Sequence, residues 1–453
     1  MNPMSLSKLA AMSGATLLAG MPETLATGIS KDTRTIRPGD LYVALRGERF
    51  DGNRYLAEAA TKGACAALCD SDPPVGLPAG FGILLTPDTQ AGLTRLAESW
   101  RGMLRLKSIV ITGSSGKTST KDFATAVLGS QFRVTATRGN LNNQIGLPLS
   151  ILEANREDEF AVWEIGMNHR GEIAPLAGLA LPEIGIVTGI GVAHIEHLGS
   201  RDEIAREKGD LLERLPATGC AILRQDDKFS EKLRARTQAR VLEVGFDEGA
   251  LRASKIRQEP AGSRFCIEGE FGTSEAYLPV PGRHMVGNAL MAVAAGLVCG
   301  IPLDQCASAL SRIELTGGRM GRVVRRGVTL LDDTYNANPD SMVAAVETLS
   351  SFPSSGRKIA VLGMMGELGP HAAAGYERVG RAASLQLDTL ICVGSEAAAI
   401  ADAAVDAGHH DVRRVSDNAA AASLLSSLAE QGDIILLKGS RSARMEEILN
   451  QFS

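Results

Sequence analysis

The sequence predicts an α/β protein of three domains: a small α/β N-terminal domain, a central domain with a mostly parallel sheet, and a Rossmann-like C-terminal domain. The chain has 453 residues, and domains commonly have about 150 residues each. Strand-like and helix-like segments alternate from about residue 88 and again after Gly317-Gly318, which is typical of parallel sheets covered by helices. We therefore expect domains at residues 1–86, 87–316 and 317–453.

The composition is that of a globular protein. Hydrophobic residues make up 44% and charged residues 22% of the chain, which excludes a disordered or collagen-like protein. The formal net charge of −5 argues against a protein that wraps nucleic acid, because such proteins are normally basic. The seven cysteines form no CxxC pair, so we expect thiols in a reducing cytosol rather than a zinc site.

The sequence predicts neither secretion nor membrane insertion. The N-terminal residues lack the compact apolar core of a signal peptide. The longest apolar stretch, residues 176–192, is interrupted by Pro182 and Glu183. We expect a cytoplasmic monomer that has no nucleic-acid or membrane partner.

The N-terminal and central domains each contain recognisable periodic segments. Leu6, Leu9 and Met12 share one face of a predicted helix, and a turn-rich connection covers residues 71–80. The other elements expected before residue 86 are strands 40–45 and 66–69 and helix 55–63. The central elements are strands 107–112, 133–137, 160–165, 184–188, 220–223 and 241–246, helices 88–103, 201–215 and 284–298, and antiparallel hairpins over 251–280.

The C-terminal domain shows a second alternation of strands and helices. The expected strands are 328–331, 358–362, 389–393, 412–415 and 433–437. The expected helices are 341–350, 373–385, 397–407, 419–430 and 443–452. This order predicts a Rossmann-like sheet.

The most specific motif is Thr112-Gly-Ser-Ser-Gly-Lys-Thr-Ser119, which follows a predicted strand and opens a predicted helix. Small residues there let backbone N–H groups surround phosphates, and the helix N-terminus adds positive potential. Lys117 can reach the β- and γ-phosphates, and the Thr118 hydroxyl can hold Mg²⁺. The loop is a shortened variant, because Ile111 stands where the general pattern has glycine. The expected contacts are Gly113, Ser114, Ser115, Gly116, Lys117, Thr118 and Ser119, against the less favoured alternative of an ordinary strand–turn–helix.

Two polar residues follow strands at the edge where a parallel sheet presents ligands. Glu164 lies near the end of strand 160–165, where a carboxylate is costly unless it has a charged partner. The alternative is an edge-strand glutamate that faces water. His194 follows the next strand through a glycine loop, with Glu196 and His197 close by. Spacing alone leaves a metal ligand and an ordinary loop histidine equally open.

Three further segments remain ambiguous from their residues. The charge pattern of residues 201–210 is typical of a solvated, salt-bridged helix face, and nothing in it separates Lys208 from Arg206. Gly363-Met-Met-Gly-Glu-Leu-Gly369 lacks the spacing of a dinucleotide loop, so we expect a wide turn that lines a cleft. Lys438 and Arg441 could meet a substrate carboxylate, or could be solvent residues at a helix N-terminus.

Together, these motifs resemble the Mur ligases, ATP-dependent amide-forming enzymes of peptidoglycan precursor synthesis. The shared motifs are Thr112–Ser119, Gly282-Arg-His with Asn288-Ala-Leu, and Gly318-Arg319 ahead of an acidic strand end. Segments 139–148, 164–172, 332–341 and 438–442 are similar to the branch of the family that adds D-alanyl-D-alanine. The resemblance covers nearly the whole chain.

The resemblance implies that ATP and two Mg²⁺ ions take part in the reaction. Thr118, Glu164 and His194 would hold metal, and Lys208 would match a lysine that is often carbamylated and helps to hold the second ion. A carbamate forms only from a neutral amine, which requires a depressed lysine pKa. The implied catalytic residues are Lys117, Lys208 and His194.

The resemblance also assigns the rest of the nucleotide site. Asn288 would contact adenine, although this chain has Met285 where the family frequently has a second asparagine. Arg319 and Asp333 would reach the γ-phosphate and the ribose when the domains close. Closure would also exclude water from the reacting groups.

The implied substrates are UDP-N-acetylmuramoyl-tripeptide and D-alanyl-D-alanine, joined through an acyl phosphate. Ser30, Asp32 and Arg34, with residues 47–52, are similar to UDP-sugar-binding segments, although Asn53 stands where the family often has histidine. The cluster of Asn140, Asn142 and Asn143 would bind the sugar and its peptide. Its alternative interpretation is a turn, which asparagine favours by itself.

Two other enzymes of the same fold remain as alternatives: a ligase that adds the third stem residue, and a folylpolyglutamate synthase-like ligase. Such ligases often carry a His-Pro or His-Thr-Pro element where this chain has Tyr335-Asn-Ala-Asn-Pro339. The absence of that element argues against both alternatives. A nucleotide-dependent switch would normally carry an Asn-Lys-x-Asp element, and the sequence has none.

Overall fold

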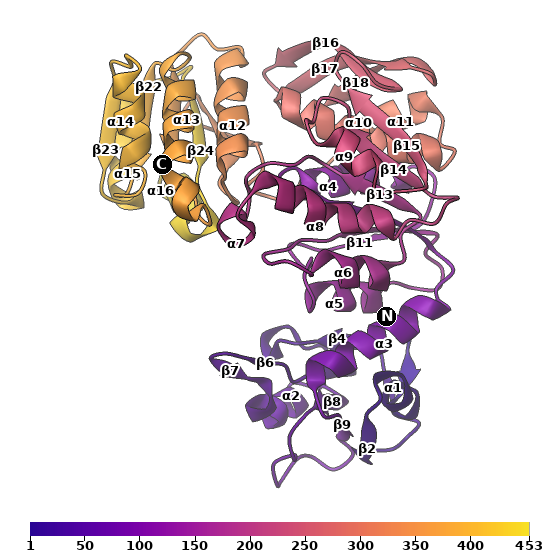
Figure 1. Cartoon of the computed structure of the whole chain (residues 1–453). Coiled ribbons are helices and arrows are strands. Elements are labelled where there is room, and N and C mark those ends of the chain that lie inside the picture. Colours follow the sequence, from indigo (N-terminus) through magenta and orange to yellow (C-terminus); the bar gives the residue numbers. More distant parts are fainter. Residues whose placement is uncertain (453) are drawn as a thin grey trace. The chain divides into compact units, whose positions relative to one another are not determined.

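The computed structural model describes residues 1–452 (Figure 1). The chain forms two compact units. The first comprises residues 1–110, 132–166 and 172–183, and the second comprises residues 111–131, 167–171 and the described residues from 184 onward. Strand β10 (Lys107–Thr112) begins in the first unit and ends in the second.

The N-terminal part of the first unit is a sheet with the strand order β2-β9-β8-β5-β4. These strands are β2 (Thr16–Ala19), β9 (Gly82–Leu85), β8 (Ala66–Cys69), β5 (Asp40–Val43) and β4 (Gly28–Ser30). Only the β2–β9 pairing in this sheet is antiparallel. Helix α1 (Leu6–Ser13) buries Leu6, Leu9 and Met12, so the predicted apolar face is confirmed.

Short elements surround this sheet in the first unit. They are β1 (Met4–Ser5), β3 (Leu25–Ala26), the 3₁₀ turn η1 (Thr33–Thr35), β6 (Arg46–Gly47), β7 (Phe50–Asp51), the 3₁₀ turn η2 (Gly52–Tyr55) and α2 (Leu56–Thr61). The strands β6 and β7 form a small antiparallel hairpin, which matters for the cavity described below.

The remainder of the first unit carries α3 (Thr89–Met103), β11 (Val134–Ala136), α5 (Gly146–Glu153), β12 (Phe160–Glu164) and α6 (Ile173–Ala180). Strands β11 and β12 pair in parallel. Arg101 of α3 is buried and donates hydrogen bonds to Ala180 O and Ser108 Oγ, at 3.1 and 3.0 Å. It thereby satisfies a carbonyl at the end of α6, which has no partner within its own helix.

The second unit contains the strand order β13-β14-β15-β16-β17-β18. These are β13 (Ile184–Val187), β14 (Cys220–Arg224), β15 (Arg240–Gly245), β16 (Leu251–Glu259), β17 (Gly262–Gly269) and β18 (Gly272–Leu278). The pairings from β13 to β16 are parallel and the last two are antiparallel. The predicted hairpins over residues 251–280 are therefore confirmed.

The helices of this part are α4 (Lys117–Gly129), α7 (Ile195–Leu198), α8 (Arg201–Glu213), α9 (Ser230–Arg234), α10 (Arg283–Val298) and α11 (Leu303–Leu310). Helix α10 is buried along most of its length because it is rich in alanine, glycine, valine and leucine. Gly296 of α10 lies so close to Val127 of α4 that an added Cβ would sit 2.5 Å from its Cγ1. This close packing fixes α10 against the helix that follows the phosphate loop.

The C-terminal sheet has the strand order β19-β20-β24-β21-β22-β23. Its strands are β19 (Gly321–Arg325), β20 (Val328–Asp333), β24 (Ile434–Lys438), β21 (Lys358–Leu362), β22 (Thr389–Val393) and β23 (Val412–Val415). All pairings from β20 onward are parallel, and β19 joins antiparallel to β20. The insertion of β24 between β20 and β21 brings the ends of three loops together at one edge, as in Rossmann-like sheets.

Helices cover both faces of this sheet. The core on one face contains Val361, Ile391 and Leu437 together with Leu425 and Ile448 of two helices. Those helices are α15 (Asn418–Leu428) and α16 (Glu446–Gln451), and the others are α12 (Pro339–Ser351), α13 (Ala372–Ser384) and α14 (Ala398–Asp406), with 3₁₀ turns η3 (Gly369–His371) and η4 (Arg441–Ala443). Figure 1 shows α12, α13 and α14 side by side. The predicted alternation is confirmed.

The differences from the sequence expectation are short elements. Strands β1, β2, β3, β4, β6, β7, β9 and β19 and helix α11 are present where none was predicted, and helices α5, α6, α7 and α9 lie between strands where helices were expected without stated bounds. Helix α5 is buried almost throughout, and α6 lies at the start of a long apolar stretch, so neither shows the alternating polar face that identifies an amphipathic helix. Within residues 1–452, no helix has the length and apolar character needed to cross a membrane.

Candidate active site

The phosphate loop joins β10 to α4 in the geometry that the motif predicts. Gly113 and Gly116 adopt positive φ angles of 149° and 82°, which a residue with a side chain rarely adopts. Gly116 occupies the N-cap position of α4. Because glycine has no side chain, it gives the helix start no side-chain cap, and an uncapped helix N-terminus is the kind of site at which anions bind.

The loop is held in place by the segment that follows β13. Ser114 N donates to Gly189 O at 2.9 Å, and Thr188 Oγ1 donates to Ser115 O at 2.5 Å. Lys117 Nζ curls back onto the loop and donates to Gly113 O at 2.9 Å. The buried hydroxyl of Ser114 has no hydrogen-bond partner within residues 1–452. A phosphate oxygen is a group that could accept that hydrogen bond.

Asn288 lies directly beneath the loop. A Cβ added to Gly116 would sit 2.6 Å from the Asn288 side-chain oxygen, so glycine at this position permits the close approach of α10. The Asn288 amide is buried, and its Nδ2 lies 4.0 Å from Met285 Sδ. Asn288, predicted to contact adenine, thus lies next to the phosphate loop, and Met285 packs against it where the family frequently has a second asparagine.

Lys208 is buried on the inward face of α8, with 1% of its surface exposed. Desolvation first, and the positive charge of Lys117 second, lower the pKa of Lys208 well below its ordinary value, while Glu207 opposes them. The interpretation of residues 201–210 as a solvated face is therefore wrong for Lys208. The helical period places it with the buried Ile204 and Leu211, whereas Arg206 is exposed.

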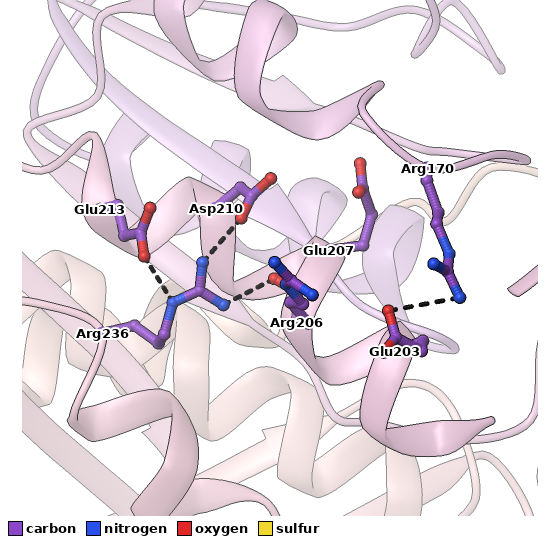
Figure 2. Close-up of a pocket in the computed structure, with 7 residues that line it drawn as sticks. All are labelled: Arg170, Glu203, Arg206, Glu207, Asp210, Glu213 and Arg236. Carbon is purple, nitrogen blue, oxygen red and sulfur yellow. Dashed lines mark hydrogen bonds and ion pairs between the residues drawn. The ribbon is translucent and has the colours of Figure 1, made fainter.

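The opposite face of α8 matches the solvated interpretation. A cavity of about 660 Å³ is lined by charged side chains of both signs: Arg170, Glu203, Arg206, Glu207, Asp210, Glu213 and Arg236. Figure 2 shows these side chains. Arg236 bridges Asp210 and Glu213 at 2.7 and 2.6 Å, and Arg170 lies 3.4 Å from Glu203. None of the residues predicted to bind a ligand lines this cavity.

His194 starts α7, and its ring contacts a residue that the sequence analysis did not single out. Its Nδ1 lies 2.5 Å from Oε2 of Glu367, in the turn after β21. The hydrogen-bonded partner His194 first, and then the nearby charges of His197 and His169, hold the pKa of Glu367 below its usual range, against desolvation. The turn over residues 363–369 was predicted correctly, but nothing in its glycine spacing indicated that Glu367 would meet His194.

Residues just before β19 and at the start of α12 contact the phosphate loop and the segment after β13. Arg319 Nη2 donates to Thr118 Oγ1 at 3.1 Å, and its guanidinium lies 3.9 Å from the ring centre of Tyr335. Asn338 Nδ2 donates to Ser115 Oγ at 2.9 Å. Asp340 Oδ2 accepts from Val192 N at 3.0 Å. The motif Tyr335-Asn-Ala-Asn-Pro339 thus supplies contacts that its sequence alone did not assign.

Asp333 and Lys438 end the adjacent parallel strands β20 and β24, where they are paired in register. Lys438 Nζ lies 2.5 Å from Asp333 Oδ2 and 3.0 Å from Asn336 O, and Lys438 is buried. Asp333 Oδ1 also accepts from Met320 N at 3.2 Å. The interpretation of Lys438 as a solvent residue is therefore wrong, whereas Arg441 is exposed and pairs with Glu446.

In the first unit, Glu164 ends β12 and is 2% exposed. The alternative of an edge-strand glutamate that faces water is wrong. Asn142 Nδ2 donates to Glu164 Oε1 at 2.8 Å, which links two predicted site residues. Asn143 Oδ1 instead accepts from Ile145 N and Gly146 N at the start of α5, as the turn interpretation predicts, and Asn140 is exposed.

A cavity of about 550 Å³ in the first unit is lined by residues of two predicted substrate segments, 30–34 and 47–52, and by Ile145, but by none of the three predicted asparagines. Its lining residues are Lys31, Asp32, Thr33, Arg34, Tyr42, Leu45, Arg46, Gly47, Phe50, Tyr55, Glu58 and Ile145. The Arg34 side chain, through its hydrogen bonds, lowers the pKa of Asp32 to about 2. Phe50 and Tyr55 stack with ring centres 5.3 Å apart. Ser30 lies buried beneath this wall, where its Oγ donates to Asp32 O.

Family models match most of the chain. A model described as the Mur ligase middle domain matches residues 111–296. A second, the Mur ligase glutamate ligase domain, matches residues 318–441, and a third, the Mur ligase family catalytic domain, matches residues 26–86. The chain belongs to the Mur ligase family. As a Mur ligase it is an enzyme, an ATP-dependent ligase that forms amide bonds.

Relatives of this Mur ligase share one name. Proteins of Bacillus subtilis (strain 168) and Escherichia coli (strain K12), both named UDP-N-acetylmuramoyl-tripeptide–D-alanyl-D-alanine ligase, are each 36% identical to it. The alignments cover 94% and 93% of this chain and 93% and 92% of the relatives. These values extend the family likeness over nearly the full length, as the sequence motifs predicted.

Solved structures show the same fold. A crystal structure of MurF from Acinetobacter baumannii is 31% identical, covers 99% of this chain and 98% of its own, and has a TM-score of 0.90. The MurF ligase of Thermotoga maritima, in complex with ADP, is 27% identical over 94% of this chain and 97% of its own, with a TM-score of 0.83. The prediction of a three-domain α/β Mur ligase fold is confirmed.

We expect the Asp333–Lys438 pair to be essential for stability when one partner alone is removed. Asp333→Ala leaves a buried ammonium without its carboxylate and should cost about 3–5 kcal/mol of unfolding free energy. The double variant Asp333→Ala/Lys438→Met removes both charges and should recover most of that loss. Urea titration of wild type and both variants measures this, and a double variant as unstable as the single one would contradict it.

His284 should make stability depend on pH. Burial lowers the pKa of this imidazole from 6.5 to about 4, partly opposed by Asp333. Because the unfolded chain takes up a proton below pH 6.5 and the folded chain does not, wild type should lose stability as pH falls toward 4. From pH 7 to 5 this group contributes a loss of about 2 kcal/mol, which His284→Gln should abolish in urea titrations at the two pH values. Equal pH dependence of both proteins would refute the burial of a neutral imidazole.

Proposed function

We propose that this Mur ligase joins D-alanyl-D-alanine to UDP-N-acetylmuramoyl-tripeptide and produces the UDP-N-acetylmuramoyl-pentapeptide precursor of peptidoglycan. The observation that carries the proposal is the phosphate loop, whose open helix start lies beside Lys117 and Asn288. The shared name of the relatives supports the choice of substrates. We also propose domain limits at 1–86, 87–316 and 317–453, which contain the matched family ranges 26–86, 111–296 and 318–441.

ATP phosphates would bind along residues 113–119. The positive end of the α4 dipole, which has no side-chain cap from Gly116, and the Ser114 hydroxyl, which has no partner within residues 1–452, suit phosphate oxygens. Lys117 can exchange its bond to Gly113 O for a stronger, charge-assisted bond to a phosphate. Ser115, Thr118 and Ser119 would complete the cradle.

The nucleoside would extend from the loop toward α10 and β20. Asn288 lies against Gly116 and would contact adenine. Each carboxylate oxygen has two lone pairs, so Asp333 can accept from a ribose hydroxyl while it keeps Lys438 and Met320 N. Arg319 already reaches Thr118 Oγ1, and the same guanidinium would contact the γ-phosphate.

Two Mg²⁺ ions would be held by Thr118, Glu164, His194 and a carbamylated Lys208. The residue types fit, since carboxylate, hydroxyl, carbamate oxygen and imidazole are all metal-binding groups. The burial of Lys208 supports the modification, because desolvation favours the neutral amine that reacts with CO₂. When bound, the ions would neutralise charge on the transferring phosphoryl group. Their presence is a proposal that rests on these side chains.

The UDP part of the sugar substrate would bind in the cavity of the first unit. Its wall offers Lys31, Arg34 and Arg46 for phosphates and the stacked Phe50 and Tyr55 as a flat apolar surface. Asp32 holds the lining segment in place, because it accepts hydrogen bonds from Ser30 Oγ through its carbonyl and from Arg34 N through its carboxylate. Asn140, Asn142 and Asn143 precede Ile145, which lines the same cavity, and we propose that they contact the sugar and its peptide.

The reaction requires activation of a carboxylate. The tripeptide carboxylate would attack the γ-phosphorus of ATP, which forms an acyl phosphate and releases ADP. The amine of D-alanyl-D-alanine then attacks the acyl carbon, loses a proton, and expels inorganic phosphate as the amide bond forms. Lys117 and Arg319 would stabilise negative charge during the transfer. Positioning the amine beside the acyl phosphate and away from water can contribute effective molarities on the order of 10⁵ M.

The alternative ligases have weaker support. A diaminopimelate-adding ligase structure and a folylpolyglutamate synthase of Mycobacterium tuberculosis are only 16% and 20% identical, with TM-scores of 0.54 and 0.65. At that identity they share the fold alone.

The direct test is product formation by the purified enzyme with ATP, Mg²⁺ and both proposed substrates. Wild type should release phosphate only when D-alanyl-D-alanine is present with the UDP-sugar tripeptide, and mass spectrometry should detect the pentapeptide product. Lys117→Ala should lower ADP formation by at least about a thousandfold, because it removes the phosphate-loop cation, while circular dichroism remains that of wild type. Lys232→Ala, which removes an exposed lysine on α9, is the control. Normal turnover by Lys117→Ala would show that the phosphate-loop assignment is wrong.

Lys208→Ala should lose most activity, and small carboxylates or bicarbonate should restore part of it. The physical reason is that a free carboxylate can occupy the place of the carbamate. Initial rates with and without added acetate, compared with those of Arg206→Ala on the exposed face, measure the effect. Kinetics unchanged by Lys208→Ala would remove this residue from the mechanism.

A further inference from the structure

Glu367 has no role in the proposed function, yet it is the side chain that meets His194. The Nδ1–Oε2 distance is 2.5 Å. The backbone makes a second connection at the same point, because Glu196 N donates to Glu367 O at 3.3 Å. Gly369 of the same turn lies so close to Glu196 that an added Cβ would sit 2.9 Å from its Cγ. The turn after β21 is therefore seated directly on the start of α7.

Both partners of this pair have a strained backbone. His194 has a φ angle of 63° and Glu367 a φ angle of 60°. Side-chain-bearing residues seldom adopt this left-handed conformation, and it costs on the order of 1 kcal/mol or more for each residue. Such strain persists where the surrounding structure fixes it, and it is common at functional sites. Here two strained residues from distant parts of the chain face each other through their side chains.

The two ring nitrogens of His194 have different surroundings. Nδ1 faces Glu367, whereas no hydrogen bond or ion pair of Nε2 is formed with the described residues. A histidine that binds a metal through one nitrogen usually donates the other N–H to a carboxylate or carbonyl, which fixes the tautomer and the ring orientation. Nδ1 of His194 and Oε2 of Glu367 lie at the contact distance that this rule requires, although within residues 1–452 Nδ1 forms no hydrogen bond of standard angle.

We propose that Glu367 is a positioning residue for His194: it accepts the Nδ1 proton and so presents an unprotonated Nε2 to a divalent cation. This inference rests on the proposed role of His194 as a metal ligand. Because Glu367 belongs to the C-terminal sheet and His194 follows β13, the ligand is oriented only while the turn over residues 363–369 stays seated on α7. The carboxylate thereby couples metal affinity to the position of that turn.

Metal binding gives the first test. Mn²⁺ is titrated into the enzyme with a non-hydrolysable ATP analogue, and free Mn²⁺ is measured by electron paramagnetic resonance. Glu367→Ala should raise the Mn²⁺ Kd by roughly 10–100-fold, whereas Glu367→Gln, whose carbonyl still accepts the Nδ1 proton, should stay within about threefold of wild type. Glu377→Gln, an exposed carboxylate on α13, is the matched control and should bind like wild type.

The same titration separates this inference from the proposed function. His194→Ala with unchanged Mn²⁺ affinity would refute the metal role of His194 and, with it, the reason for the inference. Weakened binding by His194→Ala together with unchanged binding by Glu367→Ala would overturn the role of Glu367 alone. Equal weakening by Glu367→Ala and Glu367→Gln would also overturn it, because a charge rather than a hydrogen-bond acceptor would then be required.

Nuclear magnetic resonance of metal-free enzyme labelled with ¹⁵N-histidine gives the second test. The His194 signal, identified by its absence from His194→Ala, should show a protonated Nδ1 and an unprotonated Nε2. Glu367→Ala should shift the ring toward the Nε2-protonated tautomer, and Glu367→Gln should retain the wild-type form. A wild-type His194 protonated on Nε2 alone would refute the proposal without reference to any metal or activity.

Discussion

The close approach of Asn288 to Gly116 is the constraint on which the nucleotide site depends. Glycine is required there because its φ angle is 82° and because a Cβ would meet the buried amide at 2.6 Å. The same glycine leaves the start of α4 uncapped, so the helix offers its N–H groups to an anion. Because Gly116 has no side chain, the start of α4 has no side-chain cap, and Asn288 of α10 can pack directly against the phosphate loop.

Burial of charge shapes the second unit around this loop. Lys208 is buried near the positive charge of Lys117, and desolvation favours its neutral form. Lys438 is buried as well, but its pairing with Asp333 compensates for the lost hydration. Two lysines with similar exposure thus have different chemistry, because one has a carboxylate at 2.5 Å and the other has a like charge nearby. The Lys208 environment favours the neutral amine that the proposed modification requires, and the Asp333–Lys438 pair fixes adjacent strand ends.

The sequence predicted the elements that carry the site with good accuracy. The phosphate loop was recognisable because a β-branched strand, small residues and a helix start follow one another locally. Glu164 could be selected because a carboxylate at the end of an apolar strand is costly without a partner, and it is buried with Asn142 as its donor. Lys208 could not be distinguished by composition from Arg206, since both belong to a charged helical segment. Only the family resemblance selected it.

The amino-acid sequence by itself determined the strand and helix order, the family and the phosphate loop, because these depend on local propensity, periodicity and contiguous motifs. Tertiary structure alone decided which long-range partners the polar side chains have. Glu367 meets His194, Asn338 meets Ser115, and Lys438 meets Asp333 through contacts that span more than 100 residues of chain. The physical reason is that sheet order and helix packing, rather than spacing along the chain, fix the surroundings of a side chain and therefore its charge and its partners.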